Sequence, residues 1–261
     1  MELLGIDVGG SGIKGAPVDV RTGLLTATRH RLATPRGAKP EPVAETVASI
    51  VHHFGWSGPV GCCFPARVKK GVAKTAANID PSWIGTNVST LFAEASGCPF
   101  VVLNDADAAA IAEMEFGVGS DLDGVVLLLT FGTGIGSALF TDGVLMPNTE
   151  FGHFYLRGLT AEHYASDLAR RKEQLGWDGW AARAQEYLSH LERLFDIDVI
   201  ILGGGISKPK KKEKYLHLLQ TEARLLTAEL ENEAGIVGAA YSARALADLA
   251  VKHDTFSQRT S

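Results

Sequence analysis

Two glycine-rich turns in the sequence could hold a phosphate with backbone N–H groups. They are Gly10-Ser-Gly12-Ile-Lys-Gly15 and Gly132-Thr-Gly134-Ile-Gly136, and each follows an apolar, strand-like run. Glycine suits such a turn because it lets the backbone approach a ligand closely and adopt positive φ. A third glycine group, Gly203-Gly-Gly205, follows another apolar run and suits a flat or bulky ligand. The alternative is that these turns are ordinary hairpins.

The first turn also matches the dinucleotide-binding pattern GxGxxG. That interpretation requires a helix after the third glycine, because the helix N-terminus holds the pyrophosphate. Gly15 leads instead into Ala16-Pro-Val-Asp-Val20, where a proline among β-forming residues predicts a strand. The pattern therefore favours a tight β-hairpin that faces a phosphate.

Two aspartates stand where apolar strands end. Asp105 follows the strand predicted at 100–103, at the carboxyl end where α/β sheets bind ligands. A carboxylate there can accept the proton of a hydroxyl group during phosphoryl transfer. Alternatively Asp105 caps the following helix, although Asp107 could take that role and leave Asp105 for catalysis. Asp7 ends the first strand and could orient Mg²⁺ through water, or simply stabilise the turn.

The elements predicted around these residues form two α/β halves. Strand, glycine turn and strand occur in succession at 5–19 and again at 129–142, which predicts a duplicated fold facing a shared cleft. We expect a small N-terminal domain over 1–122 and a larger domain over 123–243. A C-terminal helix over 244–261 is expected to complete the first domain.

The composition is that of an ordinary globular protein of 261 residues, with 46% apolar and 21% charged residues. A net charge of −5 argues against a general nucleic-acid binder. The sequence contains no apolar run long enough for a membrane span and no secretory signal, so we expect a cytoplasmic protein. Three cysteines without CxxC spacing indicate neither a disulfide framework nor a zinc site.

Five motifs together resemble those of the ROK sugar kinases, a family of the actin–hexokinase–Hsp70 superfamily. In chain order they are Leu4-Gly-Ile-Asp-Val-Gly-Gly-Ser-Gly-Ile-Lys14, Leu103-Asn-Asp-Ala-Asp107, Thr130-Phe-Gly-Thr-Gly-Ile-Gly136, Glu150-Phe-Gly-His153 and Leu202-Gly-Gly-Gly-Ile-Ser207. Three further segments resemble the short bacterial polyphosphate glucokinases and polyphosphate/ATP glucomannokinases in particular. They are Ala76-Ala-Asn-Ile-Asp80, Met146-Pro-Asn-Thr-Glu150 and Glu231-Asn-Glu-Ala-Gly-Ile-Val-Gly-Ala-Ala240.

The resemblance implies two ribonuclease-H-like domains around an interdomain cleft, and a homodimer. It implies phosphorylation of glucose at the 6-hydroxyl with polyphosphate, ATP or both, with Mg²⁺ near Asp7 and Asp105 as the general base. The implied sugar-binding residues are Asn78, Asn104, Asp105, Glu150 and His153. The implied donor-binding residues are Asp7, Gly9, Gly10, Ser11, Gly12, Lys14, Thr133, Gly134, Gly204, Gly205 and Lys208.

Three departures from the family pattern bear on specificity. Many ROK proteins carry a cysteine-rich zinc motif after the histidine, but residues 154–164 contain no cysteine, so we expect no structural zinc. Tyr155 stands where the polyphosphate subgroup has a sugar-binding glutamate, and Glu162 does not match that position. Arg67 stands where relatives tend to have glycine, and it either alters specificity or faces solvent.

The segment Lys208-Pro-Lys-Lys-Lys-Glu-Lys214 places five lysines within seven residues. It follows the third glycine group and could bind a polyanion longer than ATP, or it could be a solvated loop.

Three alternative functions are open. One is an ATP-only hexokinase for glucose, mannose or another hexose. Another is a non-catalytic sugar sensor, suggested by Tyr155 alone. The third is a sugar-responsive repressor, which would carry an N-terminal winged helix, whereas here the first phosphate loop begins at residue 9.

Overall fold

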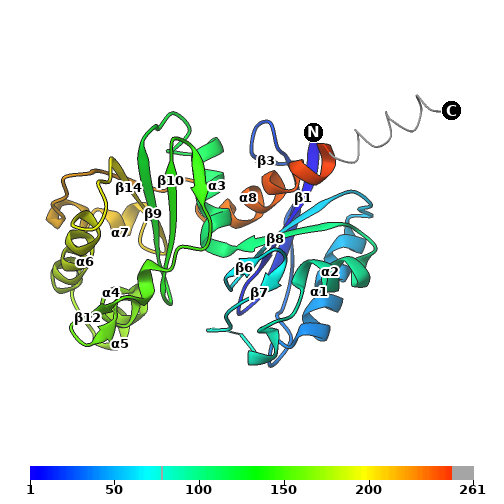
Figure 1. Cartoon of the computed structure of the whole chain (residues 1–261), viewed down its shortest axis with the longest axis horizontal. Coiled ribbons are helices and arrows are strands. Elements are labelled where there is room, and N and C mark those ends of the chain that lie inside the picture. Colours follow the sequence, from blue (N-terminus) through cyan, green and yellow to red (C-terminus); the bar gives the residue numbers. More distant parts are fainter. Residues whose placement is uncertain (78, 249–261) are drawn as a thin grey trace. The chain divides into compact units, whose positions relative to one another are not determined.

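The computed structural model describes residues 1–77 and 79–248, and these form two compact units (Figure 1). The first unit comprises residues 1–112 and the described residues from Glu233 onward, and the second comprises residues 113–232. Each unit is built on one main sheet with helices around it, as expected for an α/β protein.

The sheet of the first unit has six strands among the described residues, in the order β3-β2-β1-β5-β8 with β4 also paired to β2. β1 and β2 form an antiparallel hairpin, whereas β1, β5 and β8 are parallel. The strands are β1 (Glu2–Val8), β2 (Ile13–Asp19), β3 (Leu24–Leu25), β4 (His30–Leu32), β5 (Val60–Phe64) and β8 (Phe100–Asn104). A strand directly follows the first glycine turn, so the dinucleotide-binding interpretation is excluded.

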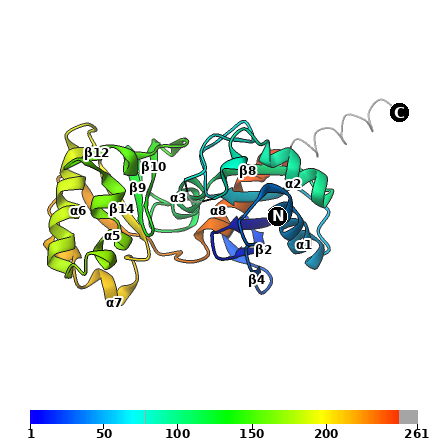
Figure 2. The ribbon, with the colours of Figure 1, turned by 90° about the horizontal axis from the view of Figure 1, so that it is seen from below.

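The helices of this unit are α1 (Pro40–His53), α2 (Val88–Ser96), α8 (Ala234–Ser242) and the first part of α3 (Asp105–Phe116), which continues into the second unit. A short hairpin, β6 (Val68–Lys69) with β7 (Val72–Ala73), and a 3₁₀ turn at Pro81–Trp83 complete it. α1 and α2 pack together beside the sheet (Figure 2). Their apolar stripes bury Val43, Val47, Ile50, Val51 and Phe92.

α8 lies unusually close to the sheet because two paired glycines leave room for its backbone. Gly5 of β1 stands opposite Gly61 of β5. A Cβ atom on Gly5 would overlap the carbonyl of Ile236, and one on Gly61 would overlap the carbonyl of Ala239. The interface therefore depends on backbone-to-sheet contact rather than on interdigitating side chains.

The sheet of the second unit repeats the arrangement of the first. Its order is β11-β10-β9-β14-β15, with β9 and β10 antiparallel and β9, β14 and β15 parallel. The predicted repeat of strand, glycine turn and strand is therefore confirmed. The strands are β9 (Val125–Phe131), β10 (Ile135–Thr141), β11 (Val144–Met146), β14 (Val199–Gly204) and β15 (Arg224–Thr227).

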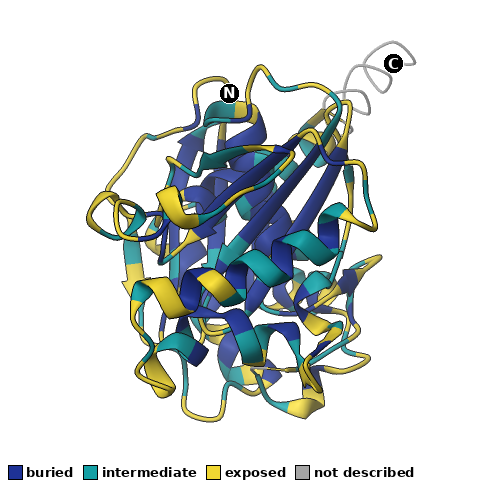
Figure 3. Ribbon diagram, turned by 90° about the vertical axis from the view of Figure 1, so that its left-hand side faces the viewer, coloured by how far each residue is buried: buried dark blue, intermediate teal, exposed yellow. Residues whose placement is uncertain are grey.

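Four helices and a small hairpin accompany this sheet. They are α4 (Ala161–Ala165), α5 (Asp167–Lys172), α6 (Trp177–Glu192), α7 (Pro209–Lys212) and the pair β12 (Tyr155–Leu156) and β13 (Leu159–Thr160), with 3₁₀ turns at Phe151–His153 and Leu216–Leu218. The buried rings of Phe131, Trp180 and Tyr187 meet edge-on between the sheet and α6. In Figure 3 most strand residues are buried, whereas the helices have a buried side and an exposed side.

The units change at Ala112 and Asn232 rather than at the expected 122 and 243. At the first change, the Glu113 carboxylate accepts hydrogen bonds from the N–H groups of Glu229 (2.8 Å) and Leu230 (2.7 Å), which ties α3 to the returning chain. At the second, α8 packs on β1 and β5 and so belongs to the first unit. The expected helix over 244–261 lies largely outside the described residues. The segment 24–32 contains the two short strands β3 and β4.

Among the residues that the structure describes, no helix combines the length and apolar character needed to cross a bilayer.

The close approach of α8 predicts that Gly61→Ala is strongly destabilising. The new methyl group would meet the Ala239 backbone, which cannot move without displacing α8, so we expect a loss of about 3 kcal/mol in the free energy of unfolding. Gly179→Ala in α6 is the matched control, since the nearest atom to its Cβ, in the Leu175 side chain, would lie 3.9 Å away. Urea unfolding of both variants checks this, and equal stabilities would contradict the packing argument.

Candidate active site

The loop between β1 and β2 is stabilised by a hydrogen bond between two of its glycines and by hydrogen bonds from two side chains outside it. The N–H of Gly9 donates to the carbonyl of Gly12 (3.1 Å). Arg31 Nη2 donates to the Ser11 carbonyl (2.8 Å), and Thr34 Oγ1 donates to the Gly9 carbonyl (2.5 Å). Gly10 and Ser11 remain exposed. The loop is thus a fixed, accessible turn of backbone.

One of the two reasons expected for glycine in these two loops is wrong. Positive φ is not used, because Gly9, Gly10, Gly12, Gly132 and Gly134 all lie outside the left-handed region. Close approach to a ligand stays a prediction, but both loops do lie close to side chains of the protein. A Cβ on Gly12 would overlap the Arg31 guanidinium, and one on Gly134 would overlap the Glu162 carboxylate.

Asp7 lies at the end of β1 with partners on both neighbouring strands. Lys14 stands opposite it on β2, and its Nζ lies 2.8 Å from Asp7 Oδ2. Cys63 stands opposite it on β5. Burial raises the pKa of the Cys63 thiol, and the charges of Asp7 and Asp105 raise it further. Both predicted carboxylates therefore lie near this thiol.

Asp105 begins α3, but its neighbour makes the principal helix cap. The Asn104 amide oxygen accepts the N–H groups of Ala106 (2.8 Å) and Asp107 (3.2 Å), and Asn104 Nδ2 donates to the Ala66 carbonyl (3.2 Å). The expectation that Asp107 would cap the helix is wrong, because Asp107 is 1% exposed within it. The Asp105 side chain is exposed, with Oδ1 also accepting the Ala106 N–H (2.9 Å). The helix end is thus capped without relying on Asp105.

The loop between β9 and β10 is closed in the same way as the first. The N–H of Gly132 donates to the Gly134 carbonyl (3.0 Å), and Thr133 is exposed between them. Gly204, at the end of β14, stands opposite Phe131 just before this loop. Gly204 has φ of 81°, and a Cβ there would lie 2.8 Å from the Phe131 carbonyl oxygen. The second and third glycine groups are therefore adjacent.

His153 lies between two glutamates close to this loop. Its Nδ1 is 3.2 Å from Glu150 Oε2, and its Nε2 is 3.6 Å from Glu162 Oε1. The segment that carries Glu150 and His153 is fastened to β10, since Ser137 Oγ accepts the N–H of Phe151 (3.0 Å). Imidazole and two carboxylates in one cluster can bracket the hydroxyl groups of a sugar.

Glu162 is the residue that sequence reasoning set aside. It reaches His153 because the chain reverses in the β12–β13 hairpin, where the Ala161 N–H donates to the Phe154 carbonyl (2.8 Å). The sequence signal for this hairpin is Arg157-Gly158 between apolar flanks. In the structure these two residues have φ of 55° and 79°, as in a two-residue hairpin turn. Tyr155, at the position expected to matter, is 78% exposed.

Comparison with known proteins fits this arrangement. A model of the ROK family matches residues 3–176. The chain belongs to the ROK family.

Relatives of known structure and activity cover nearly the whole chain. It is 48% identical to the polyphosphate glucokinase of Mycobacterium tuberculosis over 237 residues, 90% of this chain and 89% of the relative. The crystal structure of the inorganic polyphosphate/ATP-glucomannokinase from Arthrobacter sp. strain KM matches with a TM-score of 0.88 and 44% identity, over 94% of this chain and 99% of that one. A ROK glucokinase from Streptomyces griseus, in complex with glucose and AMPPNP, matches with a TM-score of 0.78 and 26% identity, over 94% and 99% of the two chains. The predicted two-domain fold of the actin/hexokinase type is confirmed.

Asn78 lies outside the described residues. Arg67 is exposed, and its backbone N–H is bound by Thr75 Oγ1 (3.0 Å). Lys208 is exposed just before α7, and Gly205 lies beside Lys211.

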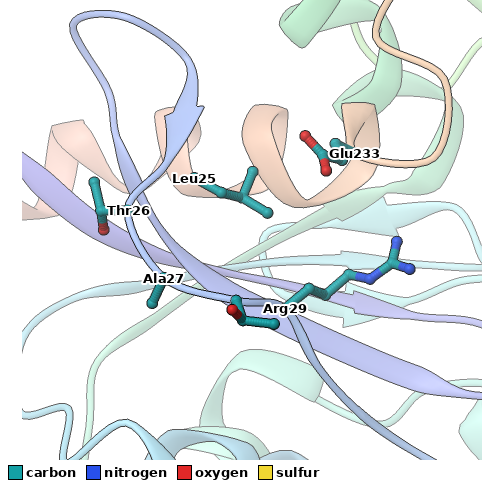
Figure 4. Close-up of a pocket in the computed structure, with 6 residues that line it drawn as sticks. Leu25, Thr26, Ala27, Arg29 and Glu233 are labelled. Atoms are coloured by element: carbon teal, nitrogen blue, oxygen red, sulfur yellow. The ribbon is translucent and has the colours of Figure 1, made fainter.

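The first unit also has an open pocket of about 660 Å³, lined by residues 25–29 and Glu233 (Figure 4). Arg29 and Glu233 give it a polar wall. None of the ROK site residues named above lines it, so the candidate site consists of the loops and strand ends rather than this pocket.

Proposed function

We propose that this ROK protein phosphorylates glucose at the 6-hydroxyl, with inorganic polyphosphate or ATP as the donor. The observation that carries the proposal is the near full-length similarity to a polyphosphate glucokinase. The arrangement of the site residues supports it, because each has a side chain suited to one part of phosphoryl transfer.

Asp105 is the proposed general base. It is an exposed carboxylate at the carboxyl end of β8, and Asn104 caps the helix behind it. A carboxylate held there can orient the sugar hydroxyl and take its proton as the bond to phosphorus forms.

Glu150, His153 and Glu162 are proposed to bind sugar hydroxyls. The imidazole is held between two carboxylates, so the cluster offers hydrogen-bond donors and acceptors in fixed positions. Glu162 supplies a carboxylate that the sequence at Tyr155 lacks.

The glycine loops are proposed to hold the donor phosphates. Gly9, Gly10, Ser11 and Gly12 form one backbone turn, of which Gly10 and Ser11 are exposed, and Thr133 with Gly134 forms the other. We also propose that Lys14, Gly204, Gly205 and Lys208 contact the donor, because the resemblance to the ROK kinases implies it.

A divalent cation would be held near Asp7. Mg²⁺ usually binds one or two carboxylates, water and substrate phosphates, and Asp7 would supply one carboxylate. When bound, the ion neutralises phosphate charge. The identity of the ion and the homodimer stay predictions.

The direct test measures glucose 6-phosphate formation with Mg²⁺, with nucleotide-free polyphosphate and ATP supplied in separate reactions. Turnover with polyphosphate is the expected result. Turnover with ATP alone would favour the hexokinase alternative, and no turnover with either would favour the sugar sensor.

Asp105→Asn should lower kcat by about 100- to 10,000-fold while the fold is kept. The asparagine oxygen can still accept the Ala106 N–H, and Asn104 still caps α3, so the circular dichroism spectrum should not change. Retention of most of the activity would rule out this residue as the base.

Glu162→Gln should raise the KM for glucose about tenfold or more, because a hydrogen bond to a charged group is lost. Tyr155→Phe is the control at the position of the missing glutamate, and its exposed hydroxyl predicts less than about a twofold change. Steady-state kinetics in glucose separates the two, and a larger effect at Tyr155 would overturn the assignment.

A further inference from the structure

One nearly buried carboxylate in the second unit gathers three cations. The Asp167 side chain, in α5, is 7% exposed. Its Oδ1 lies 2.9 Å from Arg170 Nε, and its Oδ2 lies 3.4 Å from Arg171 Nε and 3.8 Å from Lys211 Nζ. The cluster of Asp167, Arg170, Arg171 and Lys211 thus carries a surplus of positive charge in a chain whose net charge is −5.

The three cations do not have equal roles. Arg170 makes the short contact, is 16% exposed, and stacks on the Trp177 ring at 4.2 Å, so it is the structural partner of Asp167. Arg171 and Lys211 are held at longer distances and are 56% and 36% exposed. Their positive charge therefore remains accessible to an anion from solvent.

The cluster adjoins the glycine groups that the proposed function assigns to donor phosphates. The N–H of Leu168, next to Asp167, donates to the Gly132 carbonyl (3.0 Å). Lys211 Nζ lies 3.8 Å from the position that a Cβ on Gly205 would take. Lys211 of the cluster therefore lies next to the third glycine group. Asp167 directly precedes Leu168, which is hydrogen-bonded to the second glycine group.

The lysine run is not a uniform surface. Lys211 faces Asp167, and Lys212 Nζ donates to Thr227 Oγ1 (3.3 Å), whereas Lys208, Lys210 and Lys214 are exposed. The run therefore contains one lysine that the fold places in a cation cluster.

We propose that Asp167 positions Arg171 and Lys211 to bind the donor phosphates beyond the one that is transferred, and that this pair favours polyphosphate over ATP. The inference rests on the proposed function. Polyphosphate continues as a charged chain where ATP carries a nucleoside, so cations next to the phosphate loops gain more from polyphosphate. Guanidinium and ammonium groups both bind phosphate, the guanidinium through paired N–H donors. Asp167 is a positioning residue, since it acts through the two cations.

The test compares two double variants that remove the same charge from the same segments. Arg171→Ala with Lys211→Ala removes the pair, whereas Lys172→Ala with Lys214→Ala removes two exposed cations outside the cluster. Polyphosphate binding is measured by titration calorimetry at several salt concentrations, and the donor KM values by glucose 6-phosphate formation.

We expect the first double variant to weaken polyphosphate binding at least about tenfold and to lower its salt-dependence slope by about 1.5. Its KM for ATP should change less than about twofold, and the control variant should bind polyphosphate as the wild type does. Equal losses in both double variants would show a diffuse charge effect and overturn the proposal, as would equal losses for both donors.

Asp167→Asn separates positioning from simple attraction. Removal of a negative charge should tighten polyanion binding if only net charge matters, whereas loss of positioning should weaken it. We expect weaker polyphosphate binding with an unchanged KM for ATP, and tighter binding would overturn the proposal. If the wild type binds polyphosphate through the pair but does not turn it over, the donor assignment under the proposed function fails while the cluster stands. If the wild type does not bind polyphosphate, the cluster proposal fails, whatever the result with ATP.

Discussion

The direct contact between the α8 backbone and a pair of strand glycines determines where the first carboxylate of the site can lie. Gly5 and Gly61 face each other across β1 and β5, and both must lack a side chain for α8 to fit. Two residues after each glycine, on the same strands, come Asp7 and Cys63. Near the start of α8, a Cβ on Gly235 would lie 3.1 Å from both Asp7 Oδ2 and Cys63 Sγ. The packing that stabilises the unit therefore also encloses one side of Asp7, leaving Lys14 and the exposed loop on the other.

Sequence patterns predicted the parts of the fold that depend on local signals. The continuous apolar runs at β1, β5, β9 and β14 are buried strands, and the hairpins with glycine turns follow from the residues between them. The same hairpin with a glycine turn occurs in the sheets of both units. The placement of α8 could not be predicted in this way, because it depends on glycines in strands far away in the sequence. The same features that identify Gly5 as part of a strand say nothing about which helix lies on it.

The site shows the same limit. Asp7 lies at the end of a strand, and Asp105 and the loop glycines follow strands directly, so their positions were predictable from strand ends. Glu162 and Asp167 reach the site through a hairpin and through a backbone bond from α5 to the Gly132 loop. Their partners are 9 residues away for Glu162, at His153, and 44 away for Asp167, at Lys211, and composition carries no record of such contacts. Glu162 was set aside because it was compared by position in a motif rather than by position in space.

In the proposed reaction, the neighbouring residues Asn104 and Asp105 divide structural and chemical work. A single aspartate at this point would have to cap α3 and serve as a base, and the cap would compete with the substrate for its oxygens. Here the nearly buried amide of Asn104 takes two backbone N–H groups and anchors to Ala66, so its geometry is set by the protein alone. The N-terminus of α3 favours a negative charge on Asp105. For the phosphoryl transfer proposed above, a loose transition state depends more on an aligned hydroxyl than on early removal of its proton. In the proposed reaction, Asp105 therefore acts mainly by orienting the sugar hydroxyl. The cap that Asn104 makes holds the helix end that carries Asp105.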